Sequence, residues 1–104
     1  MPDPVAGLLL LAAATGFAGE VDPGRAASLE TLVRQDCGSC HGLTLAGGLG
    51  PDIRATALDG MPPDVLAEVI LDGRPGTAMP PWRPLISEAD AAWIAEFLLE
   101  GDVE

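Results

Sequence analysis

Basic residues are scarce in this chain of 104 residues. It has no lysine and only five arginines, against sixteen aspartates and glutamates, so its formal net charge is −11 at pH 7. Such an acidic surface repels phosphate backbones and anionic lipid headgroups, which argues against binding to nucleic acid or to a membrane surface. The same charge favours partner proteins with a basic docking surface. The alternative is that the negative charge only keeps a secreted protein soluble.

Histidine and cysteine are scarcer still, with one His and two Cys in the whole chain. A structural zinc site usually takes four nitrogen or sulfur ligands, and only three such residues exist here. A single His that is committed to another role leaves none for acid–base catalysis. We therefore expect neither a zinc site nor an enzyme with a small-molecule substrate.

These three scarce residues all fall in CGSCH, residues 37–41. CxxCH is the attachment pattern of a c-type haem. Cys37 and Cys40 lie about one helical turn apart, so both sulfurs can form thioethers with the vinyl groups of one haem, and His41 then offers its imidazole to the iron. A thioredoxin-like CxxC or a short-range disulfide is the alternative, but the flanking sequence has no βαβ pattern. We predict one covalently bound haem c.

The first residues resemble a secretory signal peptide. The apolar run over residues 5–14 is too short to span a bilayer, and Gly16 and Ala18 fit the small-residue rule for cleavage. We expect a signal peptide over residues 1–18, one domain over residues 19–104, and a periplasmic location. The opening MPDP carries an acid and no base, unlike a usual signal. An atypical signal or an uncleaved membrane anchor is therefore the alternative.

Apolar spacing predicts three main helices and no convincing strand. The helices are expected over about residues 25–41, 62–72 and 88–100. Glycines break any period in residues 42–60, and a proline-rich stretch over residues 74–84 cannot form regular helix. The expected fold is all-α, with three main helices and irregular loops wrapped around one prosthetic group.

Each expected helix has an apolar stripe that should face the core. Ser87 is placed as the N-cap of the last helix, with Asp90 three residues later in a near relative of the capping box. The stripes are Leu29, Leu32 and Val33 in the first helix, Val65, Leu66, Val69 and Ile70 in the second, and Trp93, Ile94, Phe97 and Leu98 in the third.

A second iron ligand is expected from methionine, whose sulfur often accompanies His in electron-transfer haems. Met1 leaves with the signal, and Met61 begins the second helix, where packing against the haem or the core explains it. Met79 lies in a stiff loop in which Pro80 and Pro81 limit the freedom of the backbone. Met79 is therefore the expected ligand.

Two further side chains are candidates at the edge of the haem. Trp82 has an apolar body with one N–H donor, so it can cover the ring and bond a propionate, although ordinary core packing explains it equally well. Arg54 is the first base after CGSCH and can reach a propionate. The alternative is a solvated surface arginine.

With these residues identified, the chain resembles a class I cytochrome c of the small bacterial kind. The resemblance rests on CGSCH after an amphipathic helix, then GLGPDI, AMPPW and a final AAWIAEFLLE, and it covers nearly the whole mature chain. It implies the class I cytochrome c fold around one haem. It also implies that the carbonyl of Pro51 accepts the N–H of His41 and orients that ring.

The same resemblance implies that the first and last helices cross. Trp93 or Phe97 should then lie against the face of Leu29 and Val33. The family often has a glycine at this crossing, and this chain has Ala26 and Ala27 instead.

Within the class, LTLAGGLGPDI and ILDGRPGTAMPPW make the chain most similar to cytochrome c55X, found with the haem-d1 nitrite reductase of denitrifying bacteria. The similarity implies a periplasmic one-electron carrier that serves this reductase. One alternative is an accessory factor in the biogenesis of haem d1 or the maturation of the reductase. Another is a gas sensor in which Met79 leaves the iron.

Overall fold

The computed structural model describes residues 21–101, and within that range every regular element is a helix. The prediction of a signal peptide over residues 1–18 lies outside the described residues. The elements are α2 (Pro23–Leu32), the π-helical turn η1 (Val33–Cys37), α3 (Gly38–His41), α4 (Pro63–Asp72) and α5 (Glu88–Glu100). Because α2, η1 and α3 follow one another without a break, they form one helical rod. The expectation of an all-α fold with three main helices is confirmed.

The rod begins at Pro23, two residues before the predicted start. Asp22 caps it by accepting a hydrogen bond from the backbone N–H of Arg25 at 2.8 Å, and Pro23 needs no partner in the first turn. Leu29 and Val33 are completely buried. The sequence predicted a plain helix, whereas η1 has i→i+5 hydrogen bonding, which turns the residues after it about the rod axis relative to an α-helix.

Helix α4 buries a face that is turned slightly from the predicted stripe. Leu66 and Ile70 are buried as expected, but Val65 is 45% exposed. Ala67 and Leu71, which the predicted stripe did not include, are also buried, and α4 packs against α5.

Helix α5 begins with the capping box that the sequence predicted. The Ser87 hydroxyl accepts from the N–H of Asp90, and the Asp90 carboxylate accepts from the N–H of Ser87, both at 3.0 Å. Phe97 is buried, whereas Trp93 is only half-buried and stacks on it with ring centroids 5.0 Å apart. Gly101 ends the helix in a left-handed conformation.

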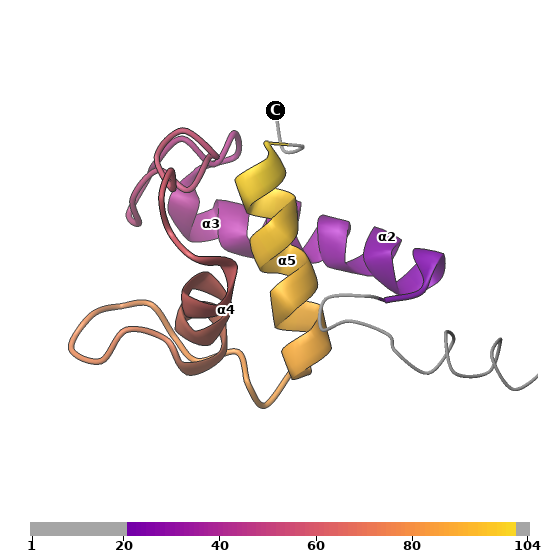
Figure 1. Ribbon diagram of the computed structural model, residues 1–104. Helices are drawn as coiled ribbons and strands as arrows, with labels where there is room; N and C mark the ends of the chain where they lie inside the picture. The colour runs from indigo at the N-terminus through magenta and orange to yellow at the C-terminus, as the bar shows by residue number, and fades with distance from the viewer. Residues whose placement is uncertain (1–20, 102–104) are drawn as a thin grey trace, which may run out of the picture.

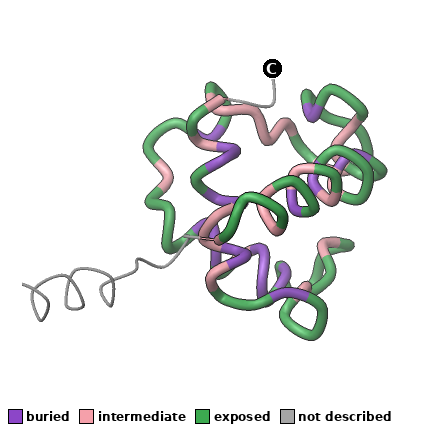
Figure 2. Tube along the Cα trace, turned by 90° about the vertical axis from the view of Figure 1, so that its right-hand side faces the viewer, coloured by how far each residue is buried: buried purple, intermediate pink, exposed green. Residues whose placement is uncertain are grey.

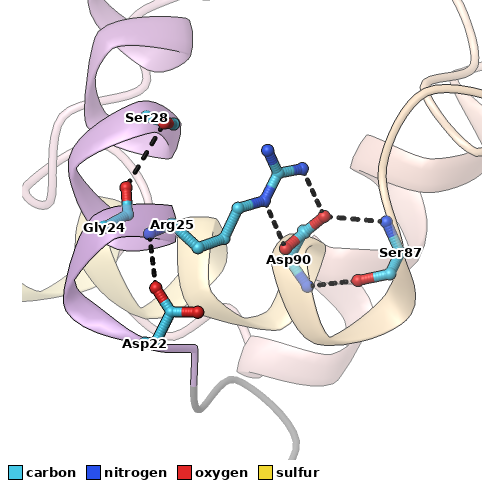
Figure 3. Close-up of polar contacts among 6 residues, drawn as sticks. All are labelled: Asp22, Gly24, Arg25, Ser28, Ser87 and Asp90. Carbon is cyan, nitrogen blue, oxygen red and sulfur yellow. Dashed lines mark hydrogen bonds and ion pairs between the residues drawn. The ribbon is translucent and has the colours of Figure 1, made fainter.

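An ion pair joins the first turns of α2 and α5 (Figure 3). The Arg25 guanidinium donates from Nε and Nη2 to the two oxygens of Asp90 at 3.1 and 2.6 Å. The Asp90 side chain is 10% exposed. The bonds from Arg25, followed by the backbone bond from Ser87, lower the pKa of Asp90 to about 2 although partial burial opposes this.

The helices enclose a single cluster of apolar side chains. In Figure 1, α5 passes across the rod of α2 and α3, with α4 beside its lower half, and residues 74–84 form a loop that projects to one side. The implied crossing of the first and last helices is therefore present, and Ala26 is half-buried there while Ala27 is exposed. Figure 2 shows that buried positions recur along the helices and are sparse in the loops.

Candidate functional site

The three residues of the CxxCH motif lie at the end of the rod. Cys37 is the last residue of η1 and is half-buried, Cys40 is exposed on α3, and His41 ends α3 half-buried. Both thiols are free, so no disulfide joins them. The rod therefore presents two sulfurs and one imidazole within five residues.

The pKa of Cys37 distinguishes a haem attachment site from a thioredoxin-like CxxC site. Burial, with smaller contributions from Asp36 and Cys40, raises the pKa of the Cys37 thiol to about 11. Redox-active CxxC sites instead lower the pKa of a thiol, because the thiolate is the nucleophile. The thiol of Cys37 is protonated at neutral pH, which argues against a thioredoxin-like site.

The ring of His41 is held by the loop that follows it. Its Nδ1 lies 2.7 Å from the carbonyl oxygen of Pro51. Because a carbonyl oxygen only accepts, we assign the ring proton to Nδ1, which leaves the lone pair of Nε2 available to a metal. The contact that the resemblance implies is present, and its part in holding a haem is a proposal.

Gly50 lies against the ring of His41, a contact that the sequence analysis missed. A Cβ at Gly50 would come within 2.6 Å of Cε1 and 2.7 Å of Nδ1 of that ring. Any side chain at this position would therefore displace the imidazole or the loop. The sequence signal for this contact was the place of Gly50 directly before Pro51, because the carbonyl of Pro51 has to approach the His41 ring.

Backbone hydrogen bonds close the loop after His41. The amides of Gly47 and Gly50 donate to the carbonyls of His41 and Cys40 at 2.8 and 2.7 Å. Leu45 holds the loop to the core, because its side chain is buried although its φ of 63° lies in the left-handed region, which is costly for leucine. The glycine-rich composition of the loop concealed that Leu45 belongs to the core. The only sequence signal was the alternation of apolar and polar residues in LTL, residues 43–45.

The three candidates Met61, Met79 and Trp82 are all half-buried. Met79 is half-buried in the loop between α4 and α5, and its backbone N–H bonds the Thr77 hydroxyl at 3.3 Å. Met61 and Trp82 are half-buried and pack against the core cluster. Core packing therefore accounts for part of the Trp82 surface, as one of its two interpretations supposed.

Arg54 is bound within its own segment of chain. Its Nε and Nη2 donate to the two carboxylate oxygens of Asp52 at 3.1 and 2.8 Å. These bonds, and then a backbone bond from the N–H of Arg54, lower the pKa of Asp52 to about 2. The interpretation of Arg54 as a merely solvated surface residue is incomplete, because its guanidinium is committed to an ion pair.

A model of the family described as cytochrome C oxidase, cbb3-type, subunit III matches residues 24–98. The chain is also 58% identical over 97 residues to cytochrome c55X of Paracoccus denitrificans, and the match covers 93% of this chain and 94% of that protein. The chain belongs to the c-type cytochromes of the cytochrome c55X group. This cytochrome therefore has the class I cytochrome c fold.

Two solved structures resemble this cytochrome. The c-type cytochrome NirC is 51% identical, with a TM-score of 0.77 over 80% of this chain and 98% of that one. The dihydro-heme d1 dehydrogenase NirN in complex with DHE is 37% identical, with a TM-score of 0.63 over 67% of this chain but only 15% of that one. This cytochrome therefore matches a small part of that enzyme.

The residues of this cytochrome fit a covalent haem. The bond from Nδ1 to Pro51 leaves Nε2 of His41 available to a metal, and the raised pKa of the Cys37 thiol suits thioether formation better than a metal thiolate site. Among residues 21–101, no group of three or more His, Cys, Asp or Glu is arranged to hold a metal ion by itself. None of the helices in this range is long and apolar enough to cross a bilayer.

Proposed function

We propose that this cytochrome is a periplasmic carrier of single electrons in denitrification, and that it donates electrons to nitrite reductase. The observation that carries the proposal is the imidazole of His41, which is fixed through Nδ1 by Pro51 at 2.7 Å beside two free cysteines. The likeness to cytochrome c55X over nearly the whole chain supports the role in denitrification.

In this proposal the chain holds its cofactor through four side chains. Cys37 and Cys40 form the two thioethers, and His41 and Met79 are the two axial ligands. Bound haem c supplies an iron that takes up or gives up one electron. Pro51 keeps the imidazole oriented and raises its strength as a donor.

Two other residues are proposed at the edge of the cofactor. Trp82, half-buried against the core, covers the ring with its indole. Arg54 contributes positive charge near a propionate while its bonds to Asp52 keep the guanidinium in place. No side chain is required to move a proton, which fits a carrier better than an enzyme.

The partner is proposed to dock through basic residues. The chain has sixteen acidic residues and five basic ones, and three of those arginines are bound to Asp52, Asp72 or Asp90. Long-range attraction between an acidic carrier and a basic surface raises the rate of encounter. The rate of electron transfer to the reductase should therefore fall as ionic strength rises.

The first experiment asks whether the haem is covalent. The protein should be exported from a host with the attachment machinery, and its intact mass should exceed that of the polypeptide by one haem. The mature N-terminus read from the same mass also tests cleavage after residue 18. Colourless protein with the mass of the polypeptide alone would end the proposal.

The second experiment measures electron transfer directly. Reduced protein is mixed with nitrite reductase in a stopped-flow instrument, and the oxidation of the haem is followed at several salt concentrations. The proposal expects rapid, salt-sensitive transfer. A double substitution of Cys37 and Cys40 to Ala provides a control that lacks the thioethers.

The alternative is an accessory role in the assembly of haem d1. It is favoured by the 37% identity to part of the dihydro-heme d1 dehydrogenase NirN, whose structure is in complex with DHE. Slow transfer to the reductase, together with tight binding to haem-d1 maturation proteins, would support this role over that of a carrier.

A further inference from the structure

The segment that carries Met79 is a loop whose two ends are fastened to the same turn of helix. It leaves α4 at Gly73 and returns at Trp82, whose N–H donates to the carbonyl of Ile70 at 3.2 Å. The N–H of Arg83 donates to the carbonyl of Leu71 at 2.9 Å. The position of this loop is therefore set by the C-terminal end of α4.

Gly73 is the point at which the returning loop touches the helix end. It is buried, and its φ of 71° is in the left-handed region. A Cβ there would lie 2.6 Å from the carbonyl oxygen of Met79, 2.9 Å from the carbonyl carbon of Pro80 and 3.0 Å from the nitrogen of Pro81. These are backbone atoms, which cannot rotate away as the end of a side chain can. Only glycine allows the loop to close in this position.

An ion pair fastens the same junction from outside. The Arg83 guanidinium donates from Nε and Nη2 to the two oxygens of Asp72 at 2.8 and 2.9 Å. Asp72 directly precedes Gly73, and Arg83 directly follows Trp82. The pair therefore bridges the two ends of the loop without touching Met79.

We propose that the C-terminal end of α4 is the positioning seat of Met79, formed by Gly73 against the Met79 backbone and closed by the Asp72–Arg83 pair. The proposal rests on the proposed role of Met79 as an axial ligand. A side chain at position 73 would push the backbone of Met79 and Pro80 outward and carry the side-chain sulfur of Met79 away from the iron. Gly73 therefore acts through Met79 and touches no cofactor itself.

Gly76 provides a matched control in the same loop. Its φ is 83°, close to that of Gly73, but a Cβ there would meet nothing within 4 Å. Alanine at either position has to adopt a positive φ, and Gly73, whose ψ is −170°, has a conformation that glycine alone adopts readily. Only Gly73→Ala adds an atom against Met79. Gly76→Ala therefore controls for a positive φ in this loop, and Asp72→Asn, which leaves Gly73 unchanged, controls for the strain at position 73.

The experiment compares Gly73→Ala, Gly76→Ala and the parent protein, each with its haem attached and with its helix content checked by circular dichroism. The readouts are the sulfur-to-iron absorption band of the oxidised protein and the affinity of the oxidised haem for imidazole. Gly73→Ala should lose most of the sulfur-to-iron band. It should also bind imidazole at least about tenfold more tightly, because imidazole then competes with a Met79 sulfur that is bound to the iron in a smaller fraction of the molecules. Gly76→Ala should keep the band and the affinity of the parent.

Equal sulfur-to-iron bands and equal imidazole affinities in the two variants would contradict the proposal that Gly73 positions Met79. Should Gly73→Ala fail to fold, Asp72→Asn tests the seat instead, since it removes the bridge to Arg83 without adding an atom. It should raise the imidazole affinity severalfold, and an unchanged affinity would overturn the proposal. Met79→Leu shows whether the proposed function itself fails, because a band that survives this change means that Met79 is no ligand.

Discussion

The loop that holds the ring of His41 and the loop that carries Met79 are fixed in different ways. The loop after His41, residues 42–53, is bonded to the very residues that form the site. The amide of Gly50 donates to the carbonyl of Cys40 at 2.7 Å, and the carbonyl of Pro51 bonds the His41 ring at the same distance. Its geometry is inseparable from that of the CxxCH motif.

The loop of Met79, residues 74–81, is fastened to α4 at its ends, and inside it the Thr77 hydroxyl donates to the carbonyl of Arg74 at 2.7 Å. Around Met79 itself the hydrogen bonds are long, at 3.3 Å from the N–H of Arg74 to its carbonyl and at 3.3 Å from its own N–H to the Thr77 hydroxyl. Bonds of this length are at the weak end of the usual range.

The difference indicates where this cytochrome can change. The histidine side is fixed at several points, because a ring contact and a backbone network hold one position, to which the two proposed thioethers would add. The methionine side depends on how one loop closes on α4. Substitutions near His41 should therefore have all-or-none effects on the position of the ligand, whereas substitutions near Met79 should have graded effects.

The largest effect is expected from Gly50→Ala. The added methyl would lie 2.6 Å from the His41 ring, so the imidazole cannot keep both its bond to Pro51 and its place. We expect little mature haem protein, and loss of the low-spin spectrum in what remains, measured by haem staining and optical absorption. Gly24→Ala is the control, because Gly24 like Gly50 has no positive φ, and the nearest atom that a Cβ there would meet is the Asp22 carboxylate at 3.4 Å. If Gly50→Ala matured normally, the ring contact would be unimportant.

The next effect is expected from Met79→Leu, which removes the sulfur and leaves an apolar side chain of similar size. The haem should stay covalently bound, because Cys37, Cys40 and His41 are untouched. The sulfur-to-iron band should vanish, and carbon monoxide should bind the reduced protein at neutral pH. Met61→Leu should preserve the band, since Met61 packs against the core. The reverse pattern would exchange the assignments of the two methionines.

A smaller effect is expected from Thr77→Val. The Thr77 hydroxyl accepts from the N–H of Met79 at 3.3 Å and donates to the carbonyl of Arg74 at 2.7 Å. Without it the loop loses one good bond and one weak one, so we expect the rate of carbon monoxide binding to rise a few-fold. Thr77→Ser keeps the hydroxyl and should resemble the parent. Identical rates in all three proteins would mean that the ends of the loop alone hold Met79.

The smallest effect on either ligand is expected from Asp90→Asn, which lies outside both loops in the first turn of α5. The change removes the charge that pairs with Arg25, so the free energy of unfolding should fall by about 1–2 kcal/mol while the absorption bands stay unchanged. The folded pKa of Asp90 is about 2 and the ordinary value is 3.8. Its stabilisation is therefore complete above about pH 4 and is lost as the pH falls toward 2.

Denaturant titrations of both proteins from pH 7 to pH 2 check this sign. The difference in unfolding free energy between parent and Asp90→Asn should shrink as the solution is acidified. A difference that is constant over this range would assign the stabilisation to packing rather than to the charge of Asp90.

The sequence sufficed for features that depend on local chemistry. Ser87 and Asp90 predicted the capping box of α5, and the CxxCH motif and the apolar stripes predicted an all-α fold around a haem. The resemblance implied the contact between Pro51 and His41 that the structure contains.

The remaining features depend on which segments meet in space. Val65 is apolar yet 45% exposed, whereas Ala67, which lay outside the predicted stripe, is buried. Gly73 only follows the expected end of the second helix in the sequence, and nothing in its neighbourhood along the chain reveals that the backbone of Met79 returns to it. Arg25 and Asp90 are 65 positions apart, so their pairing could not be predicted from local pattern.

The π-helical turn η1 rotates the side chains after it about the rod axis relative to those before it, so the two ends of the rod are aligned separately. On one side Leu29 is aligned with the core, and on the other Cys40 and His41 are aligned with the site. An i→i+5 turn offsets everything after it by a fraction of a revolution. A relative with one residue fewer between its core leucine and its first cysteine can thus keep both alignments by replacing this turn with plain α-helix. A gap placed there in an alignment then records an exchange of π-helix for α-helix that leaves both faces of the rod in place.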